Sequence, residues 1–139
     1  MIGLILVAAG LFFLVKGLDT RAEIREGLIA EQIITSRDAS IPGVLVEDAA
    51  TARAQSEAIK GHTYGRWGPY SKLDRDDPNR AVYLDGVTLR TALNLAIAGF
   101  GVADMAIGAG VLILMAGVAT LLLAAPALYF LAGAVVRRP

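Results

Sequence analysis

The sequence predicts a mainly α-helical membrane protein, with two transmembrane helices joined by a small α or α+β extracytoplasmic domain. The apolar share is 55% and the mean hydropathy is +0.58, both higher than is usual for a soluble domain. The apolar residues collect in residues 1–15 and 92–136, where Asp104 is the only charged residue. Nearly all other charges lie in residues 16–91, so two apolar segments flank one polar segment.

Charge and cysteine content exclude several classes of function. The 13 Lys and Arg balance the 13 Asp and Glu and are interleaved with them, so no basic face for nucleic acid is expected. The chain has no cysteine, which excludes disulfides, thiolate catalysis, iron–sulfur clusters and zinc–cysteine sites built from this chain. We expect no cofactor.

Residues 1–18 predict the first transmembrane helix. The run MIGLILVAAGLFFLV spans about 22 Å, and the Lys16 ammonium can snorkel to the interface and bring the helix close to a full span. The alternative is a cleaved signal peptide, but no basic segment precedes the run and no A-x-A site follows it. We therefore predict an uncleaved signal anchor, and the missing basic segment suggests a native start upstream of Met1.

Residues 92–136 predict a long apolar helix that contains the second transmembrane span. One helix of this length would measure about 67 Å, which is twice the bilayer core. The favoured layout is one long, kinked helix; the alternatives are a hairpin of spans 92–116 and 119–136, or a span with a tail against another protein. A hairpin needs a turn near residues 117–120, where no polar turn residue occurs, and Pro126 kinks a helix without reversing it.

The C-terminal residues 137–139 predict the topology. Arg137 and Arg138 follow the apolar helix directly, and such basic residues favour the cytoplasmic side. Two spans then place both termini in the cytoplasm and residues 19–91 outside it.

Residues 19–91 read as a small, thin domain. Helical spacing of apolar residues continues the first helix outward, and IITS and GVLVED, which flank Pro42-Gly43, predict a small hairpin or an extended loop. EDAATARAQSEAIKGH predicts a helix capped by Asp48, with one face formed by Ala52, Gln55, Ile59 and His62. Few large apolar residues are available for a core, so Trp67, Tyr64 and Tyr70 serve either that core or an aromatic interface with lipid or a partner.

The acidic cluster DRDDP predicts the start of the second long helix. Proline disfavours helical geometry at Asp77 and fits the first turn at position 78, and the carboxylates complement the helix dipole. The alternative is a divalent-metal site, for which the weak candidates are Asp74, Asp76, Asp77 and His62. The glycine and distant glutamate of a calcium-binding loop are absent, so no metal site is predicted.

Asp104 lies within the second apolar segment, where a charge is costly. Three interpretations remain open: a position near the outer headgroups, a bond to a partner helix, or a role in proton or ion transfer. Small residues around it allow close helix approach, so we predict helix packing or partner contact along this stripe, which comprises Gly99, Ala103, Ala106, Gly110, Gly117 and Ala124.

The block from TARAQSEAIKGH through YSKLDRDDPNR to FGVADMAIGAGVLILMAG resembles a family of small two-span membrane proteins, mostly from actinobacteria. The resemblance covers roughly residues 45–117, and it implies a bacterial plasma membrane protein whose family has no established function. Many members carry the label "aromatic ring-opening dioxygenase". Extradiol enzymes of that kind hold iron with two histidines and a carboxylate, whereas this chain has only His62, so we treat the label as a misnomer.

These observations favour a non-catalytic accessory or scaffold subunit of a larger plasma-membrane complex, such as a respiratory, photosynthetic or transport assembly. Its partners would be integral membrane subunits and the lipid bilayer, with Asp104, Trp67 and the small-residue stripe as contacts and no small-molecule substrate. The alternatives are an independent homo-oligomeric or ligand-sensing envelope protein, and an enzyme or metal carrier built on His62 and the aspartates.

Overall fold

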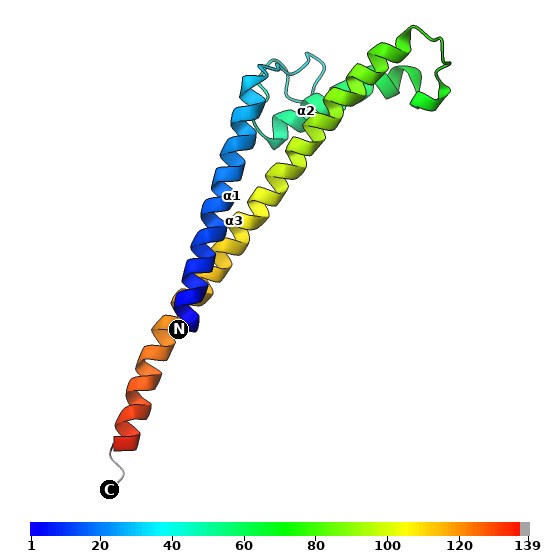
Figure 1. Cartoon of the computed structure of the whole chain (residues 1–139). Coiled ribbons are helices and arrows are strands. Elements are labelled where there is room, and N and C mark those ends of the chain that lie inside the picture. The colour runs from blue at the N-terminus through cyan, green and yellow to red at the C-terminus, as the bar shows by residue number, and fades with distance from the viewer. Residues whose placement is uncertain (137–139) are drawn as a thin grey trace. The chain divides into compact units, whose positions relative to one another are not determined.

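The computed structural model describes residues 1–136, so the predicted cytoplasmic basic end at 137–139 lies outside the described residues. The chain is mainly helical (Figure 1). A long helix α1 (Ile2–Ala30) is followed by a loop and by α2 (Ala49–Lys60). A π-helical turn, η1 (Gly61–Gly65), and a 3-10 turn, η2 (Tyr70–Lys72), lead into the second long helix, α3 (Asn79–Val136).

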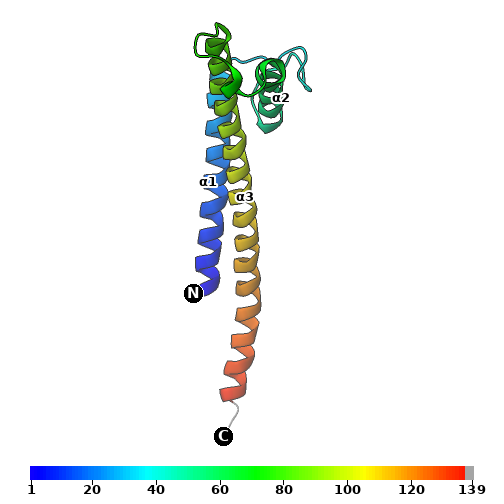
Figure 2. The same ribbon diagram turned by 90° about the vertical axis from the view of Figure 1, so that its right-hand side faces the viewer.

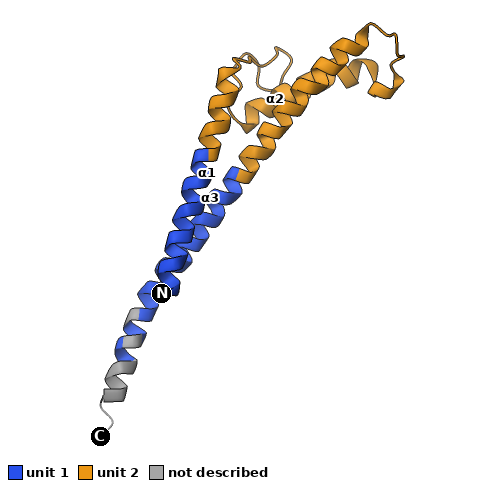
Figure 3. Cartoon of the chain, viewed as in Figure 1, with its two compact units in different colours: residues 1–19, 103–139 blue, residues 20–102 orange. Residues whose placement is uncertain are grey.

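The chain forms two compact units, coloured separately in Figure 3. Residues 1–19 and 103–139 make up the first, which we call the paired-helix unit. Residues 20–102 make up the second, which we call the cap unit.

Two helices of the described chain are long and apolar enough to cross a membrane. They are Ile2–Ala30 and Asn79–Ala124, whose most apolar 18-residue windows have mean hydropathies of 2.1 and 2.4. Only 17% and 11% of their most apolar windows are buried, whereas the core helix of a soluble protein is mostly buried. Length, composition and exposure together favour a membrane location.

The second apolar segment is one continuous helix in the described residues. α3 has 58 residues and runs through Pro126 to Val136 without a turn. The hairpin alternative is therefore wrong, because residues 117–120 carry no turn chemistry and Pro126 lies inside the helix. The N-terminal helix also continues to Ala30, well past the apolar run, as its spacing predicts.

In the paired-helix unit, α1 and α3 run side by side and touch through glycine (Figure 2). Gly3, Gly10 and Gly17 recur every seventh residue, and all three are buried. A Cβ added to Gly10 would lie 2.6 Å from the Leu114 nitrogen and 2.9 Å from the Gly110 oxygen. The two backbones are thus in direct contact, an approach that only residues without a side chain permit.

Facing glycines on α3 make the contact reciprocal. A Cβ on Gly110 would lie 2.6 Å from the Leu14 nitrogen, and a Cβ on Gly117 would lie 2.7 Å from the Val7 nitrogen. Ala103 continues this stripe one heptad earlier and is 1% exposed. Matched heptad spacing on both helices keeps the seam on one line, as in a left-handed pair of helices.

The cap unit is built from the end of α1, the following loop, α2 and the start of α3. Its main core joins these elements through Val46 and Ala52, which are 0% exposed, and Leu93, which is 1% exposed. The remaining members of this core are Ile59, Leu28, Ile33 and Ile97. Burial of these side chains is what holds four separate stretches of sequence together.

No strand forms in the described residues, so the α+β alternative is wrong and the predicted hairpin is reduced to one isolated bridge, Ile34↔Leu45. The reason lies at Thr35. Its hydroxyl accepts a hydrogen bond from the Val44 N–H at 3.0 Å, and this side chain competes with the backbone ladder. Gly43, with φ +69°, then turns the chain after a single residue pair.

Candidate functional site

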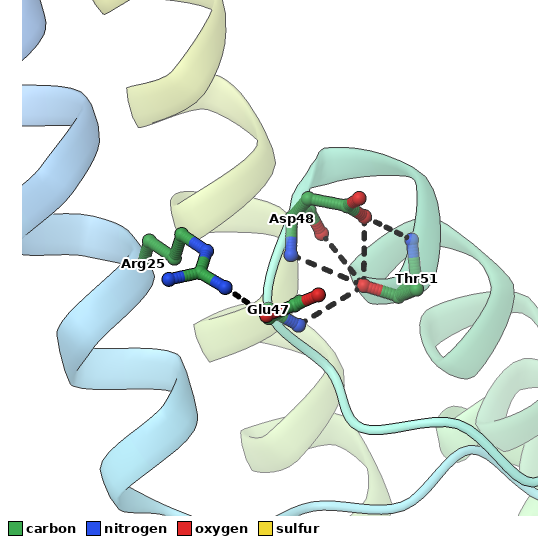
Figure 4. Close-up of polar contacts among 4 residues, drawn as sticks. All are labelled: Arg25, Glu47, Asp48 and Thr51. Carbon is green, nitrogen blue, oxygen red and sulfur yellow. Dashed lines mark hydrogen bonds and ion pairs between the residues drawn. The ribbon is translucent and has the colours of Figure 1, made fainter.

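The start of α2 is fixed by a capping box. Asp48 accepts a hydrogen bond from the Thr51 N–H at 2.8 Å, and the Thr51 hydroxyl accepts one from the Asp48 N–H at 3.1 Å. The Thr51 N–H and the Thr51 hydroxyl both donate to the Asp48 carboxylate, and these hydrogen bonds lower the pKa of Asp48 because they stabilise its charged form. Arg25 on α1 forms an ion pair with the neighbouring Glu47, so this corner ties α1 to α2 (Figure 4).

The loop before Val44 is docked at three points, two on α2 and one on the turn η1. The Ser36 N–H donates to the Gln55 side-chain oxygen at 2.7 Å, and Ala39 is buried in a small cluster with Ala54 and Ala58. The third point is the Asp38 carboxylate, which lies 2.7 Å from His62 Nε2. The hydrogen bond from His62 lowers the pKa of Asp38.

His62 lies off the buried face of α2 on which the sequence placed it. Ala52, Gln55 and Ile59 were predicted to share a face with His62, and these three are buried, but the His62 side chain is 55% exposed. The α-helix ends at Lys60, and the π-helical turn Gly61–Gly65 that follows has more residues per turn. The wider turn changes the direction in which position 62 points, and a pure 3.6-residue period could not have foreseen it.

Residues 66–73, which we call the aromatic loop, precede α3. Arg80, in the first turn of α3, holds this loop in place. Its guanidinium donates to the Leu73 carbonyl at 2.9 Å, bonds the Tyr70 hydroxyl and stacks 4.3 Å from the Tyr70 ring centre. The Tyr83 hydroxyl donates to the Gly68 carbonyl at 2.9 Å, and the Trp67 ring packs on Tyr83.

Through these contacts Trp67 and Tyr70 pack around Tyr83 inside the cap unit. Tyr83 is 3% exposed and Trp67 and Tyr70 are half-buried around it, whereas Tyr64 remains 50% exposed. The sequence reading missed the central positions of Arg80 and Tyr83. The sequence carries little indication of these positions. Both residues lie near the start of α3, and they contact a loop whose fold no local pattern specifies.

The acidic loop starts α3 as predicted. The Asp77 carboxylate accepts hydrogen bonds from the Asn79 N–H at 2.7 Å and from the Asn79 side-chain amide at 2.9 Å. Pro78, which has no N–H to satisfy, fits the turn between them. The loop forms an open hollow lined by Asp74, Arg75 and residues 76–79.

The weak metal candidates do not come together as a ligand set. His62 pairs with Asp38, and Asp77 is engaged in capping α3. Within residues 1–136, no group of three or more His, Cys, Asp or Glu side chains is placed to hold a metal ion.

The predicted small-residue contacts are made by the chain's own helices. In the cap unit, a Cβ on Gly99 would lie 2.7 Å from the Ile24 side chain on α1. In the paired-helix unit, Ala103, Gly110 and Gly117 face the three α1 glycines. Ala106 is half-buried, and Ala124 is exposed.

Asp104 follows the buried Ala103 and is exposed on α3. It therefore lies next in sequence to a residue of the α1 contact, with its side chain open to the surface. Hydropathy alone does not reveal the glycine partners on α1. The seven-residue repeat of Gly3, Gly10 and Gly17 was the available signal.

The polar side chains described above cap helices, dock a loop and tether the aromatic turn. A scan against protein-family models, a search of curated proteins and a search of solved structures each found no match.

Proposed function

We propose that this chain is a non-catalytic structural subunit of a larger bacterial plasma-membrane assembly, anchored by α1 and α3. In this proposal the cap unit is an extracytoplasmic platform and both termini are cytoplasmic. The resemblance of residues 45–117 to small actinobacterial membrane proteins supports the bacterial membrane setting. The proposed partners are integral membrane subunits, and the proposed class of assembly is respiratory, photosynthetic or transport.

One observation carries the proposal: the cap's polar residues are engaged in fixing its own loops. Asp48, Gln55, Asp77 and Arg80 each bond a neighbouring loop or helix end, which makes the cap rigid. A catalytic site instead gathers a nucleophile, a base and a charge-stabilising group around one reacting atom. A rigid cap on two apolar helices suits a scaffold.

The first experiment isolates the native-level tagged protein in gentle detergent and identifies every bound protein by mass spectrometry. A structural subunit should bring down other integral membrane subunits at fixed stoichiometry. Recovery of the chain alone, or only with itself, would contradict membership of a complex. It would favour the alternative of an independent homo-oligomeric or ligand-sensing envelope protein.

Topology has its own test, because the chain lacks cysteine. Ser40→Cys places one thiol on the exposed surface of the cap. If the cap is extracytoplasmic, a membrane-impermeant maleimide should label this thiol on intact cells. Labelling only after the cells are opened would place the cap in the cytoplasm.

A further inference from the structure

The glycine contacts show which residues of α1 and α3 lie at the same height in the paired-helix unit (Figure 3). A Cβ on Gly17 would lie 2.9 Å from the Ala103 oxygen and 2.7 Å from the Ile107 side chain, so Gly17 is level with the midpoint of these two residues. The helices are antiparallel, and the glycines one and two heptads earlier on α1 meet residues one and two heptads later on α3 in the same way. One step forward along α1 therefore corresponds to one step back along α3, and Leu18 is level with Asp104.

The charged side chains of this unit share one height. Lys16, Asp19 and Asp104 are the only charged side chains in the sequence of residues 1–19 and 103–136, and all three are exposed. By the same correspondence Lys16 is level with Ala106 and Asp19 with Ala103, so the three charges lie within one helical turn, about 5 Å. We call these three residues the charged level. Two stretches far apart in the sequence thus place their charges at the same height.

An uncharged segment begins directly at the charged level. Residues 2–15 of α1 and 105–124 of α3 contain no Asp, Glu, Lys or Arg, and we call these two ranges the apolar belt. A helix of about 20 residues measures about 30 Å, which is the thickness of the hydrocarbon core of a bilayer. Phe12, Leu112 and Met115 each expose more than half of their surface in this belt. The belt therefore has the length and the surface of a segment surrounded by hydrocarbon.

We propose that phospholipid surrounds the apolar belt, with the charged level among the headgroups of one leaflet and Tyr129 among the headgroups of the other. The inference rests on the membrane anchoring in the proposed function and adds the height at which the bilayer meets the two helices. Tyr129 is exposed and lies about 37 Å along α3 from Asp104. This distance exceeds the hydrocarbon core by several ångströms and reaches the interfacial layer, where tyrosine is enriched.

Two opposing costs fix the bilayer at this height. A bilayer shifted past the charged level would take ionised side chains into hydrocarbon, where they are costly. A bilayer shifted the other way would leave the exposed side chains of Phe12, Phe13 and Val15 in water. Each such step would withdraw apolar surface of both helices from lipid, whereas among the described residues only α3 continues beyond the belt to replace it. Of the three interpretations of Asp104, this proposal takes the position near the headgroups.

The absence of cysteine allows the depth of single positions to be measured with spin labels. Single-cysteine variants of the full-length chain are labelled and reconstituted in vesicles of phosphatidylcholine and phosphatidylglycerol. Electron paramagnetic resonance then compares collisions with oxygen, which enters hydrocarbon, and with a water-soluble nickel complex, which does not. The labelled positions, all exposed, are Leu18 at the charged level, the level pairs Leu11 with Val111 and Leu4 with Val118, Met115 in the middle of the belt, Phe130 next to Tyr129, and Ser40 in the cap unit as an aqueous reference.

The expected result is an oxygen-to-nickel collision ratio that is highest at Met115 and about tenfold lower at Leu18 and Phe130, because a polar complex is excluded from hydrocarbon. The two members of each level pair should give the same ratio, since they share one height. A maximum at Leu18 or at Phe130 would place the bilayer elsewhere and overturn the proposal. Unequal ratios within the pairs, or protection of every belt position from both reagents by protein, would overturn it as well.

Two further measurements separate this proposal from the proposed function. Resistance to alkaline carbonate extraction reports membrane anchoring, and the helical circular dichroism signal reports that each labelled variant is folded. Failure of the wild type to resist carbonate would overturn the anchoring and the position of the belt together. Resistance to carbonate with a displaced depth profile would overturn the position of the belt alone. Membership of a complex is tested independently by the proteins that co-purify.

Discussion

The forces that stabilise the paired-helix unit differ from the forces that stabilise the cap unit. In the paired-helix unit the contact consists of glycines that let one backbone touch another, with apolar side chains pointing outward. In the cap unit, side chains fill a core, and caps, ion pairs and a stacked arginine fix the loops. The proposed membrane insertion accounts for this difference. A paired-helix unit surrounded by lipid gains little by moving apolar side chains out of its solvent, so close packing remains as the cohesive force. A cap unit surrounded by water is stabilised by burial and hydrogen bonding instead.

The largest expected effect lies in the cap core. Leu93→Ala removes the most central side chain, 1% exposed, and should destabilise the cap by about 3 kcal/mol. Trp67 is the only tryptophan and lies in the cap, so its fluorescence during urea titration reports cap unfolding. Leu89→Ala, at a partly exposed site, is the control and should cost far less. Similar losses for the two variants would show that the cap has no defined core.

The next effect tests the backbone contact in the paired-helix unit. A Cβ at Gly110 would meet the Leu14 backbone at 2.6 Å, whereas one at Gly108 would meet nothing within 4 Å. Gly110→Ala should therefore separate the helices at a cost of about 2 kcal/mol, and Gly108→Ala should be close to neutral. Double electron–electron resonance between spin labels at the exposed positions Leu11 and Val111 measures the separation of α1 and α3. A change in distance with Gly108→Ala, or none with Gly110→Ala, would contradict the glycine contact.

A smaller effect is expected at the arginine tether in the cap. Arg80→Lys keeps the charge but loses the planar group that stacks on Tyr70 while bonding Leu73. We expect a loss of about 1 kcal/mol and faster amide exchange in the aromatic loop, with α2 unaffected. Hydrogen–deuterium exchange measured by mass spectrometry compares the exchange rates of the aromatic loop and of α2. Protection equal to wild type throughout that loop would show that the tether is dispensable.

The capping box predicts a pH dependence. The pKa of Asp48 is lower in the folded cap than in the unfolded chain, where it is about 3.9. The stabilising contribution of this carboxylate is therefore complete above the unfolded pKa and is lost as pH falls through the folded pKa. Asp48→Asn can still accept the Thr51 N–H but does not titrate. Wild type should lose cap stability in acid more steeply than this variant, as followed by Trp67 fluorescence. Parallel acid profiles would show that the carboxylate charge adds nothing.

The smallest effect concerns the end of α1. Gln32 lies two residues after Ala30, the last residue of α1. It adopts φ 49°, a left-handed conformation that suits glycine. Gln32→Gly should stabilise the cap by about 0.5 kcal/mol, because relief of strain outweighs the added freedom of the unfolded chain. Gln32→Ala, which keeps a Cβ, should give no gain in the same urea titration. A gain from both variants would indicate that the glutamine side chain, rather than the backbone, is unfavourable.

The sequence was informative wherever a local rule decides the structure. Asp48 and Asp77 cap the two helices that their positions predict, and the spacing of α2 predicted the shared face of Ala52, Gln55 and Ile59, which is buried. Hydropathy separated the two apolar helices from the polar segment and favoured one long α3. These features depend on residues a few positions apart, which a single sequence displays.

Features that depend on distant contacts were less accessible. The strand pair failed because Thr35 bonds Val44 by its side chain, and the aromatic loop depends on Arg80, several residues further along the chain. His62 left its predicted face because a π-turn follows α2. Of the expected small-residue stripe, Gly99, Ala103, Gly110 and Gly117 contact α1, and this pairing depends on matching residues about 75 to 115 positions away in the sequence.

The glycine contact also has a genetic consequence. Every missense change of a glycine codon adds a side chain. Such a change at Gly3, Gly10, Gly17, Gly110 or Gly117 would therefore force the two backbones apart. One residue away, on the outward faces, exchanges among apolar residues leave that contact intact. Random mutagenesis scored for loss of the protein should therefore yield hits at heptad intervals along both helices, with tolerant positions between them.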